Sequence, residues 1–331
     1  MVSQAEYDIV FYEAFEEEQE LLRKLVPEHL KARFTAQTIQ EAKEKGVPAK
    51  LISIRTQSKI PYEWNSDLDG ILSRSTGYDH LTSYRQKTGG EVALGYLPLY
   101  CARAVAEQAM LMTLALLRKF KKQTTSFDSF SRNGLTGGEC QDKKLFVVGV
   151  GNIGCEVVDI AKGLRMKVAG FDIKEKVASL EYTELKTGLA WADIVVCALP
   201  FTKVTDKMLN YDAMKMLKEG ALFVNIARGE IAPLADLKRL LDEGILGGIG
   251  LDVFEKEKTI AAALRNKIEQ DDEAVKIINE LKTKENVILT PHNAFNTLEA
   301  VEQKAEQTIE AVAMFLTQGK FPNHIPEEQY A

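Results

Sequence analysis

Short apolar runs alternate with amphipathic stretches through the middle of the chain. The apolar runs predict strands at 145–150, 168–172, 194–199, 222–226, 249–253 and 287–290. The amphipathic stretches between them predict helices, among them 152–164, 204–217 and 234–243. Because strands that alternate with helices form a parallel sheet covered on both faces, this region predicts a doubly wound α/β domain.

About the first 95 residues carry the same alternation more weakly, with strands at 8–12, 50–54 and 70–72 and helices at 16–25 and 38–45. This indicates a second, smaller α/β domain. Two long helices are expected to join the domains. The helix at 102–121 is apolar almost all round, which predicts burial, and the helix at 297–316 could return to the first domain. The predicted domains are therefore 1–101 with 298–331, and 102–297.

Composition narrows the class of protein. The 331 residues suffice for about two domains, and the net charge of −6 without a dense basic stripe argues against nucleic acid as a partner. The first residues lack the basic region of a signal peptide, and no apolar run approaches the ~20 residues of a membrane span. Four separated cysteines without a CxxC pair predict reduced thiols in the cytoplasm, and neither disulfides nor a metal site.

A glycine-rich turn follows the strand at 145–150 and opens a predicted helix. Its glycines are Gly149, Gly151 and Gly154. The first permits a tight turn, the second lets the backbone approach a pyrophosphate, and the third lets helix and strand pack closely. Backbone N–H groups at the start of the helix, at Asn152 and Ile153, would hold the pyrophosphate.

A carboxylate ends the next predicted strand. Asp172 lies 18 residues after Gly154, where it would accept hydrogen bonds from the ribose hydroxyls and repel a 2′-phosphate. This favours NAD over NADP as the cofactor. The alternative is a glycine-rich turn with a surface aspartate and no ligand. The complete sequence of strand, turn, helix and strand favours the dinucleotide site.

Polar side chains follow three later strands. They are Arg228 in LFVNIARGE, Asp252 and Glu257 in GIGLDVFEKE, and His292 in NVILTPHNAF. Because ligands bind at the carboxyl ends of parallel strands, these groups are expected near the nicotinamide. An arginine can hold the carboxylate and carbonyl of a 2-oxo acid, and a histidine can exchange a proton with the carbonyl oxygen. A carboxylate beside the imidazole fixes its tautomer and favours the protonated form.

From SRSTGYDHL to TPHNAF, the sequence resembles the D-isomer-specific 2-hydroxyacid dehydrogenase family, and VFYEAFEEE and PHNAFNT are most similar to its D-lactate dehydrogenase branch. The resemblance implies a Rossmann nucleotide domain with a smaller flavodoxin-like α/β substrate domain. It also implies a homodimer that reversibly reduces a small 2-oxo acid to the D-2-hydroxy acid with NAD. The branch usually reads PHxAFYT, and Asn296 occupies the place of its tyrosine.

The same resemblance implies roles for individual residues. Arg228, Glu257 and His292 would be catalytic, and the family spacing of 29 residues from Arg228 favours Glu257 over the nearby Glu255. The remaining expected binding residues are Asp252 at the nicotinamide carboxamide, Pro200 beside the adenosine ribose, and Thr76, Gly77 and Tyr78 in the substrate loop. Backbone N–H groups near Thr76 and Gly77 would bind the substrate carboxylate.

Some proteins with a non-catalytic function carry the same residues. The C-terminal binding protein corepressors keep the same three catalytic residues and use NAD(H) to control assembly with partner proteins. An NAD(H)-sensing, non-catalytic, partner-binding protein is therefore the alternative. Phosphite dehydrogenases carry a lysine where this chain has Thr76, and formate dehydrogenases lack the acid partner found here as Glu257, so both are disfavoured.

Overall fold

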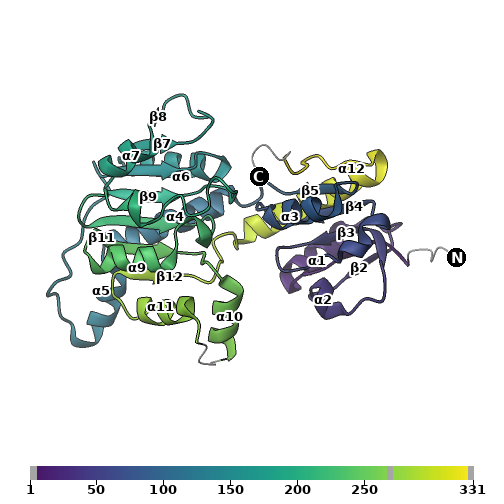
Figure 1. Cartoon of the computed structure of the whole chain (residues 1–331), viewed down its shortest axis with the longest axis horizontal. Helices are drawn as coiled ribbons and strands as arrows, with labels where there is room; N and C mark the ends of the chain where they lie inside the picture. The colour runs from purple at the N-terminus through teal and green to yellow at the C-terminus, as the bar shows by residue number, and fades with distance from the viewer. Residues whose placement is uncertain (1–5, 267–270, 327–331) are drawn as a thin grey trace. The chain divides into compact units, whose positions relative to one another are not determined.

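The computed structural model describes residues 6–266 and 271–326. The chain divides into two compact units (Figure 1). Unit 1 comprises Met1–Cys101 and Asn296–Ala331, and unit 2 comprises Ala102–Phe295. The second boundary therefore lies two residues before the one expected from the sequence. Residues 1–5 of the N-terminal segment, which was expected not to be a signal peptide, lie outside the described residues.

Unit 1 is built on a five-stranded parallel sheet with the strand order β2-β1-β3-β4-β5. The strands are β1 (Tyr7–Phe11), β2 (Ala32–Phe34), β3 (Ala49–Ile54), β4 (Gly70–Ser73) and β5 (Ala93–Tyr96). The helices are α1 (Glu16–Leu25), α2 (Ile39–Ala42), η1 (Tyr62–Ser66), α3 (Asp79–Thr88) and α12 (Leu298–Gln318). This strand order is the flavodoxin-like one, which confirms the predicted fold of the smaller domain.

The last helix of the chain packs onto unit 1. Helix α12 begins after Thr297, whose side chain accepts a hydrogen bond from the N–H of Ala300 at 3.2 Å, and it ends at Gly319 in the left-handed conformation. It packs against α1 and β4. The ring of Phe315 lies so close to Gly70 that a Cβ there would be 2.4 Å from it. The C-terminal segment thus completes the core of the N-terminal unit.

Unit 2 contains a seven-stranded parallel sheet with the order β12-β11-β10-β9-β6-β7-β8. The strands are β6 (Lys144–Val148), β7 (Lys167–Phe171), β8 (Glu181–Tyr182), β9 (Ile194–Cys197), β10 (Ala221–Asn225), β11 (Leu246–Leu251) and β12 (Val287–Leu289). The α-helices are α4 (Ala102–Leu117), α5 (Phe120–Ser126), α6 (Asn152–Gly163), α7 (Leu185–Trp191), α8 (Tyr211–Met214), α9 (Leu234–Asp242), α10 (Glu257–Asn266) and α11 (Glu273–Leu281). Two short 3₁₀ helices are η2 (Phe127–Ser129) and η3 (Gly229–Ile231). The order is that of a doubly wound Rossmann sheet, as predicted.

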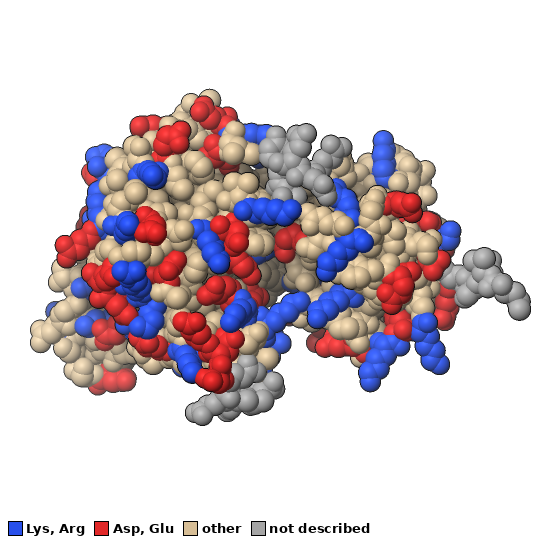
Figure 2. Space-filling model, in the orientation of Figure 1, with Lys and Arg blue, Asp and Glu red and all other residues tan. Residues whose placement is uncertain are grey.

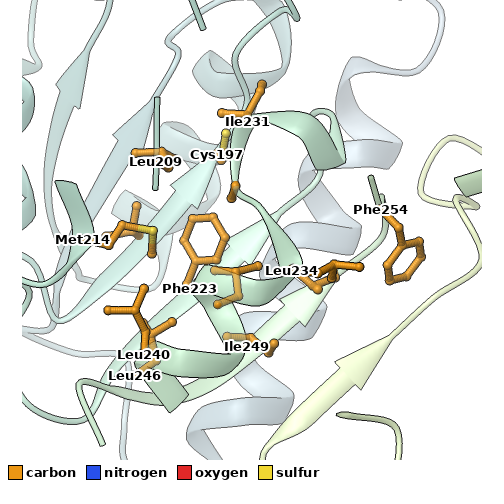
Figure 3. Packing of buried hydrophobic residues seen from close by; sticks show 14 of the residues in the cluster. Cys197, Leu209, Met214, Phe223, Ile231, Leu234, Leu240, Leu246, Ile249 and Phe254 are labelled. Carbon is orange, nitrogen blue, oxygen red and sulfur yellow. The ribbon is translucent and has the colours of Figure 1, made fainter. Parts of the chain in front are cut away.

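An apolar cluster fixes the strands of unit 2 to the helices on one face (Figure 3). Phe223 and Ile249 point from β10 and β11 into this cluster, where they meet Leu234 and Leu240 of α9. Cys197 of β9 is fully buried among them, as a small core residue. Because strands of a parallel sheet are covered on both faces, they consist of nearly continuous apolar runs, and these runs gave the clearest signal in the sequence.

The prediction of a helix over residues 204–217 is wrong for most of these residues. Only Tyr211–Met214 is helical, with Asn210 capping its N-terminus. The hydroxyl of Thr205 instead donates to the carbonyl of Pro200 at 2.7 Å, and Lys207 adopts a left-handed conformation. Threonine side chains that bond to nearby backbone groups compete with helix formation, so the amphipathic pattern here was misleading.

The expected helix at 102–121 is broken and is only partly buried. Helix α4 ends at Leu117, and Lys119 takes a left-handed conformation before α5. Helix α4 packs against α6, β10 and β11, but Leu111 and Leu114 on its outer side are exposed. The prediction that an all-round apolar helix must be buried is therefore wrong for these two residues within unit 2.

The surface agrees with the modest net charge. On the face shown in Figure 2, acidic and basic side chains are interspersed over unit 2. In the described part of the chain, no helix is both long enough and apolar enough to span a membrane.

Candidate active site

The carboxyl ends of the strands in unit 2 are in register. Val148 of β6 pairs with Phe171 of β7 and with Cys197 of β9, and Asn225 of β10 pairs with Cys197. On the other side, Leu251 of β11 pairs with Asn225 and with Leu289 of β12. The segments that follow these residues therefore leave the sheet along one edge. They carry the glycine-rich turn, Asp172, Pro200, Arg228, Asp252 and His292.

The glycine-rich turn after β6 has the shape that a pyrophosphate requires. Gly149 has a φ of +98°, which favours glycine, and a Cβ on Gly154 would lie 2.0 Å from the carbonyl oxygen of Gly149. By contrast, a Cβ on Gly151 would meet nothing within 4 Å. The backbone at Gly151 therefore faces open space just before Asn152 and Ile153 begin α6. This cradle fits the phosphates of a dinucleotide at a helix N-terminus.

Asp172 is anchored beside this turn. One carboxylate oxygen accepts a hydrogen bond from the N–H of Val150 at 2.7 Å, and the other accepts from the N–H of Lys174 at 2.9 Å. The carboxylate is thereby held at the carboxyl end of β7, next to the cradle. Pro200 is exposed after the neighbouring strand β9. Both residues thus lie at the edge expected for the adenosine half of the cofactor.

His292 and Glu257 form a pair in unit 2. The imidazole Nδ1 lies 2.9 and 3.0 Å from the two carboxylate oxygens of Glu257. Since a carboxylate only accepts hydrogen bonds, Nδ1 carries the hydrogen and donates it. This leaves Nε2 for a second partner. The side chains are 31% and 41% exposed, respectively, so a small molecule can reach them.

The backbone at His292 is unusual. Its φ is +51°, and its N–H donates to the carbonyl of Thr290 at 3.0 Å across Pro291. A non-glycine residue in this region is strained by about 1–3 kcal/mol, and such strain persists only where the surroundings impose it. The buried carboxylate of Asp252 supplies that constraint. It accepts from the hydroxyl of Thr290 at 2.6 Å and from the N–H groups of Asn293 and Ala294 at 2.9 and 3.0 Å.

The two glutamates after β11 have different partners. Glu255 accepts a hydrogen bond from the N–H of Leu234 at 3.1 Å, at the first turn of α9. Glu257 instead begins α10 and reaches His292. The geometry therefore separates a helix-capping carboxylate from one that contacts the imidazole. The family spacing favours Glu257 as the catalytic residue, and it is Glu257 that contacts the imidazole.

Arg228 follows β10 in an extended conformation. Its guanidinium donates to the carbonyl of Ala227 at 2.8 Å, and the side chain is half-buried. Asn225, fully buried at the end of β10, accepts from the N–H of Ala227 and donates to the carbonyl of Arg228, both at 3.0 Å. Sequence reasoning missed Asn225 as a positioning residue. A polar residue at the end of an apolar strand was the signal that could have found it.

Unit 1 contains the expected substrate loop directly after β4. The hydroxyl oxygen of Thr76 lies 3.2 Å from Sγ of Cys101, and the carbonyl of Gly77 accepts from the hydroxyl of Ser75 at 2.7 Å. The ring of Tyr78 packs edge-on against Tyr96, and burial raises the pKa of the Tyr78 hydroxyl. These contacts hold the loop in one conformation.

Two other features of the described residues bear on chemistry. No group of three or more histidine, cysteine, aspartate or glutamate side chains in residues 6–266 and 271–326 could hold a metal ion. A hollow of about 750 Å³ in unit 2 is lined by residues at the amino ends of the strands, such as Ile194, Ala221 and Asn286. It therefore lies at the edge of the sheet opposite to the glycine-rich turn and is separate from the candidate site.

The fold and the glycine-rich cradle define a dinucleotide-binding protein. Residues 109–294 match the sequence model of the D-isomer specific 2-hydroxyacid dehydrogenase NAD-binding domain, so the chain belongs to this family. It is an NAD-dependent dehydrogenase, as the resemblance implied. The chain is 32% identical to the D-lactate dehydrogenase of Lactiplantibacillus plantarum over 76% of both chains. It is 30% identical to the aromatic 2-oxoacid reductase of Clostridium sporogenes over 76% of this chain and 77% of that one.

A solved structure of a relative is similar to this chain over the whole fold. A D-lactate dehydrogenase from Aquifex aeolicus, complexed with NAD and lactic acid, superimposes with a TM-score of 0.83 at 27% identity. The match covers 96% of this chain and 100% of that chain. The similarity thus extends through both units.

Proposed function

We propose that this protein reversibly reduces a small 2-oxo acid to the D-2-hydroxy acid with NADH, in the manner of the D-lactate dehydrogenases. The observation that carries the proposal is the His292–Glu257 pair at the carboxyl edge of the Rossmann sheet. Membership of the family and the named activities of its relatives support it. Nothing in these relatives favours the alternative of a non-catalytic NAD(H)-sensing protein.

The residues of unit 2 have different roles at the reacting carbonyl of the substrate. Bound NADH supplies a hydride. Arg228 holds the substrate carboxylate and polarises the carbonyl, and Nε2 of His292 donates a proton to the carbonyl oxygen. Glu257 accepts from Nδ1, orients the ring and stabilises its protonated form. In the reverse direction the neutral imidazole accepts the proton.

The other expected residues bind and position. Backbone N–H groups at Thr76 and Gly77 of unit 1 bind the substrate carboxylate, and Tyr78 supports their loop. Asp252 holds the His292 loop and, we propose, also the nicotinamide carboxamide. The dinucleotide is held by Gly149, Gly151, Asn152, Ile153, Gly154, Asp172 and Pro200.

A steady-state assay tests the proposal directly. NADH oxidation is followed with pyruvate, phenylpyruvate, 2-oxoisocaproate and hydroxypyruvate. His292→Ala should lower kcat by roughly 10²–10⁴-fold, which is the usual contribution of a positioned acid–base group. His29→Ala is the matched control, because His29 is exposed in unit 1. A protein that binds NADH but reduces none of these acids would contradict the proposal.

Arg228→Lys tests the role of the guanidinium in both substrate binding and catalysis. Lysine keeps the charge but cannot reproduce the two-point fork of a guanidinium. We therefore expect KM to rise and kcat to fall together, because the fork acts both on the carboxylate and on the developing charge. A variant with parental kcat and KM would show that another residue fills this role.

We also propose that the protein is a cytoplasmic homodimer that assembles through unit 2. Large apolar side chains are exposed along α4, α5 and η2, which are consecutive in the chain. They are Leu111, Leu114, Phe120, Phe127 and Phe130, and the last two are 73% and 74% exposed. Exposed large apolar side chains favour burial against a second copy. The four cysteines are all free thiols, which supports a reducing compartment.

A further inference from the structure

The hollow at the amino ends of the strands in unit 2 has the size of a small-molecule site. Its volume is about 750 Å³, within the range of about 300–1,000 Å³ for ligand pockets. Every residue that lines it lies between Ala115 and Ile288, so unit 2 alone forms it. The hollow lies at the edge of the sheet opposite to the glycine-rich turn, and the proposed reaction uses none of its residues.

A break between two helices builds one wall of the hollow. Helix α4 ends at Leu117, and Lys119 takes the left-handed conformation with a φ of +50° before α5 begins. The carbonyl of Leu117 accepts a hydrogen bond from the N–H of Gly138 at 2.8 Å. A Cβ on Gly137 would lie 2.5 Å from the same carbonyl oxygen, so this close approach requires glycine. The loop before β6 is thereby fixed against the end of α4.

Apolar side chains form another part of the lining. Ile194 of β9 and Leu116 of α4 are buried, whereas Leu117 of α4, Leu222 of β10 and Ile288 of β12 are half-buried. All five belong to helices or strands of unit 2, so they present a fixed apolar surface. Such a surface suits the uncharged part of a ligand.

The charged side chains of the lining are mostly basic. Six lysines and three carboxylates line the hollow, namely Lys119, Lys121, Lys122, Lys143, Lys218 and Lys284, with Asp193, Glu219 and Glu285. The lysines come from four separate parts of the chain, which are the region where α4 meets α5 and the segments that precede β6, β10 and β12. The fold therefore brings together basic groups that are dispersed along the sequence.

Three of these lysines are neutralised by carboxylates. The distances from the ammonium to the carboxylate are 3.0 Å for Lys122 with Glu285, 2.7 Å for Lys218 with Asp193, and 3.0 Å for Lys284 with Asp242. The second oxygen of Asp193 accepts from the N–H of Lys144 at 2.9 Å. The remaining carboxylate of the lining, Glu219, is exposed, and solvent screens an exposed charge.

Two further lysines are held by backbone carbonyls. The ammonium of Lys121 donates to three carbonyls, those of Lys282 and Lys284 at 2.8 Å and that of Val287 at 3.2 Å. Lys119 donates to a carbonyl in the loop before β6, at 3.2 Å. Neither ammonium forms an ion pair with a described residue. Burial lowers the pKa of Lys121 against the opposing charge of Glu285, as expected for a cation that lacks a close counter-ion.

The ammonium of Lys143 forms neither a hydrogen bond nor an ion pair within the described part of the chain. Its side chain is half-buried and passes Gly138, where a Cβ would lie 3.7 Å from its Cε. Burial alone would raise the pKa of Asp193, but Lys218, the N–H of Lys144 and the charge of Lys143 together lower it. Lys143 is thus close enough to act on charges inside the hollow.

We propose that the hollow is a second ligand site, which binds a small phosphorylated molecule of the nucleoside triphosphate type. Its phosphates neutralise Lys119, Lys121 and Lys143, and its uncharged part packs against the apolar side chains. Among the described residues the basic lining consists of lysine without arginine. Lysine binds phosphate as a point charge, whereas recognition of a planar carboxylate favours the fork of an arginine. This site is additional to the dehydrogenase centre and does not depend on it.

Calorimetric titration of the NADH-saturated protein with ATP tests the proposal. NADH occupies the glycine-rich cradle, so the binding that remains reports another site. We expect one ATP per chain and a Kd that rises with ionic strength, because salt screens the lysines. Absence of binding at millimolar ATP, or competition between ATP and NADH, overturns the proposal.

Two variants locate the site. Lys143→Gln and Lys119→Gln each remove a charge that has no ion pair among the described residues, and each should weaken ATP binding by about 10–100-fold, the range for a hydrogen bond to a charged group. Lys186→Gln is the matched control, because Lys186 is exposed on α7 and does not line the hollow. Unchanged NADH binding verifies that the variants are folded. Equal weakening in all three variants would indicate non-specific attraction and overturn the site.

Two simpler ligands test the assigned chemistry. ATP should bind more tightly than inorganic phosphate, which cannot use the apolar surface, and more tightly than adenosine, which carries no charge. Adenosine that binds as tightly as ATP would show that the lysines are not used. Phosphate that binds as tightly as ATP would show that the apolar surface is not used, and either result contradicts the proposed class of ligand.

Discussion

Replacing the two neighbouring glutamates, one at a time, separates the catalytic partner of His292 from a structural carboxylate. Glu257 contacts Nδ1 of His292 at 2.9 Å, whereas Glu255 accepts from the N–H of Leu234 at 3.1 Å. Glu257→Ala should therefore reduce activity with little effect on stability. Glu255→Ala should reduce stability with little effect on kcat.

The magnitudes follow from the exposure of each pair. A hydrogen bond to a charged group contributes about 1.5–3 kcal/mol, and the 31% and 41% exposed fractions of His292 and Glu257 place this bond toward the lower end. Loss of that amount from the transition state corresponds to about a tenfold to hundredfold decrease in kcat. The same partly exposed pair contributes at most about 1 kcal/mol to folding.

Glu255→Ala instead removes a capping interaction from α9. Loss of a cap costs about 1 kcal/mol, which lowers the melting temperature by roughly 2–4 °C in a domain of this size. The assay is steady-state NADH oxidation together with thermal unfolding, measured on both variants and the parent. If Glu255→Ala lost activity while Glu257→Ala kept it, the assignment of the acid–base partner would be refuted.

Two further predictions concern the cofactor and assembly. The kcat/KM with NADH should exceed the kcat/KM with NADPH by a factor on the order of a hundred, and Asp172→Ala should reduce this ratio. Equal kcat/KM for the two cofactors would contradict this prediction. Light scattering at micromolar concentration should give a dimer that Phe127→Asp with Phe130→Asp converts to a monomer; a monomeric parent would refute the proposed assembly.

Features that depend on residues close together in the chain could be predicted from the sequence. The strands of unit 2 appear as apolar runs because a parallel sheet is covered on both faces. The glycine-rich turn could be recognised because each glycine meets a constraint from residues close in the chain, such as the carbonyl of Gly149 beside Gly154. Several short elements were missed, including β2, β5, α3, α7, α10 and α11, since elements of three to ten residues depend mainly on packing for their stability.

By itself, the sequence determined the class of fold, the cofactor and the family, because these follow from periodicity and from motifs with fixed spacing. Only the tertiary structure showed the contact between Glu257 and His292, and that Leu111 and Leu114 on α4 remain exposed within unit 2. It also decided that Arg74, which follows β4, is a buried partner of Glu18, which is 56 residues away in the chain. Such contacts join residues that are far apart in the chain, and they depend on how the strands and helices pack. Neither secondary-structure propensity nor spacing along the chain specifies which distant residues come into contact.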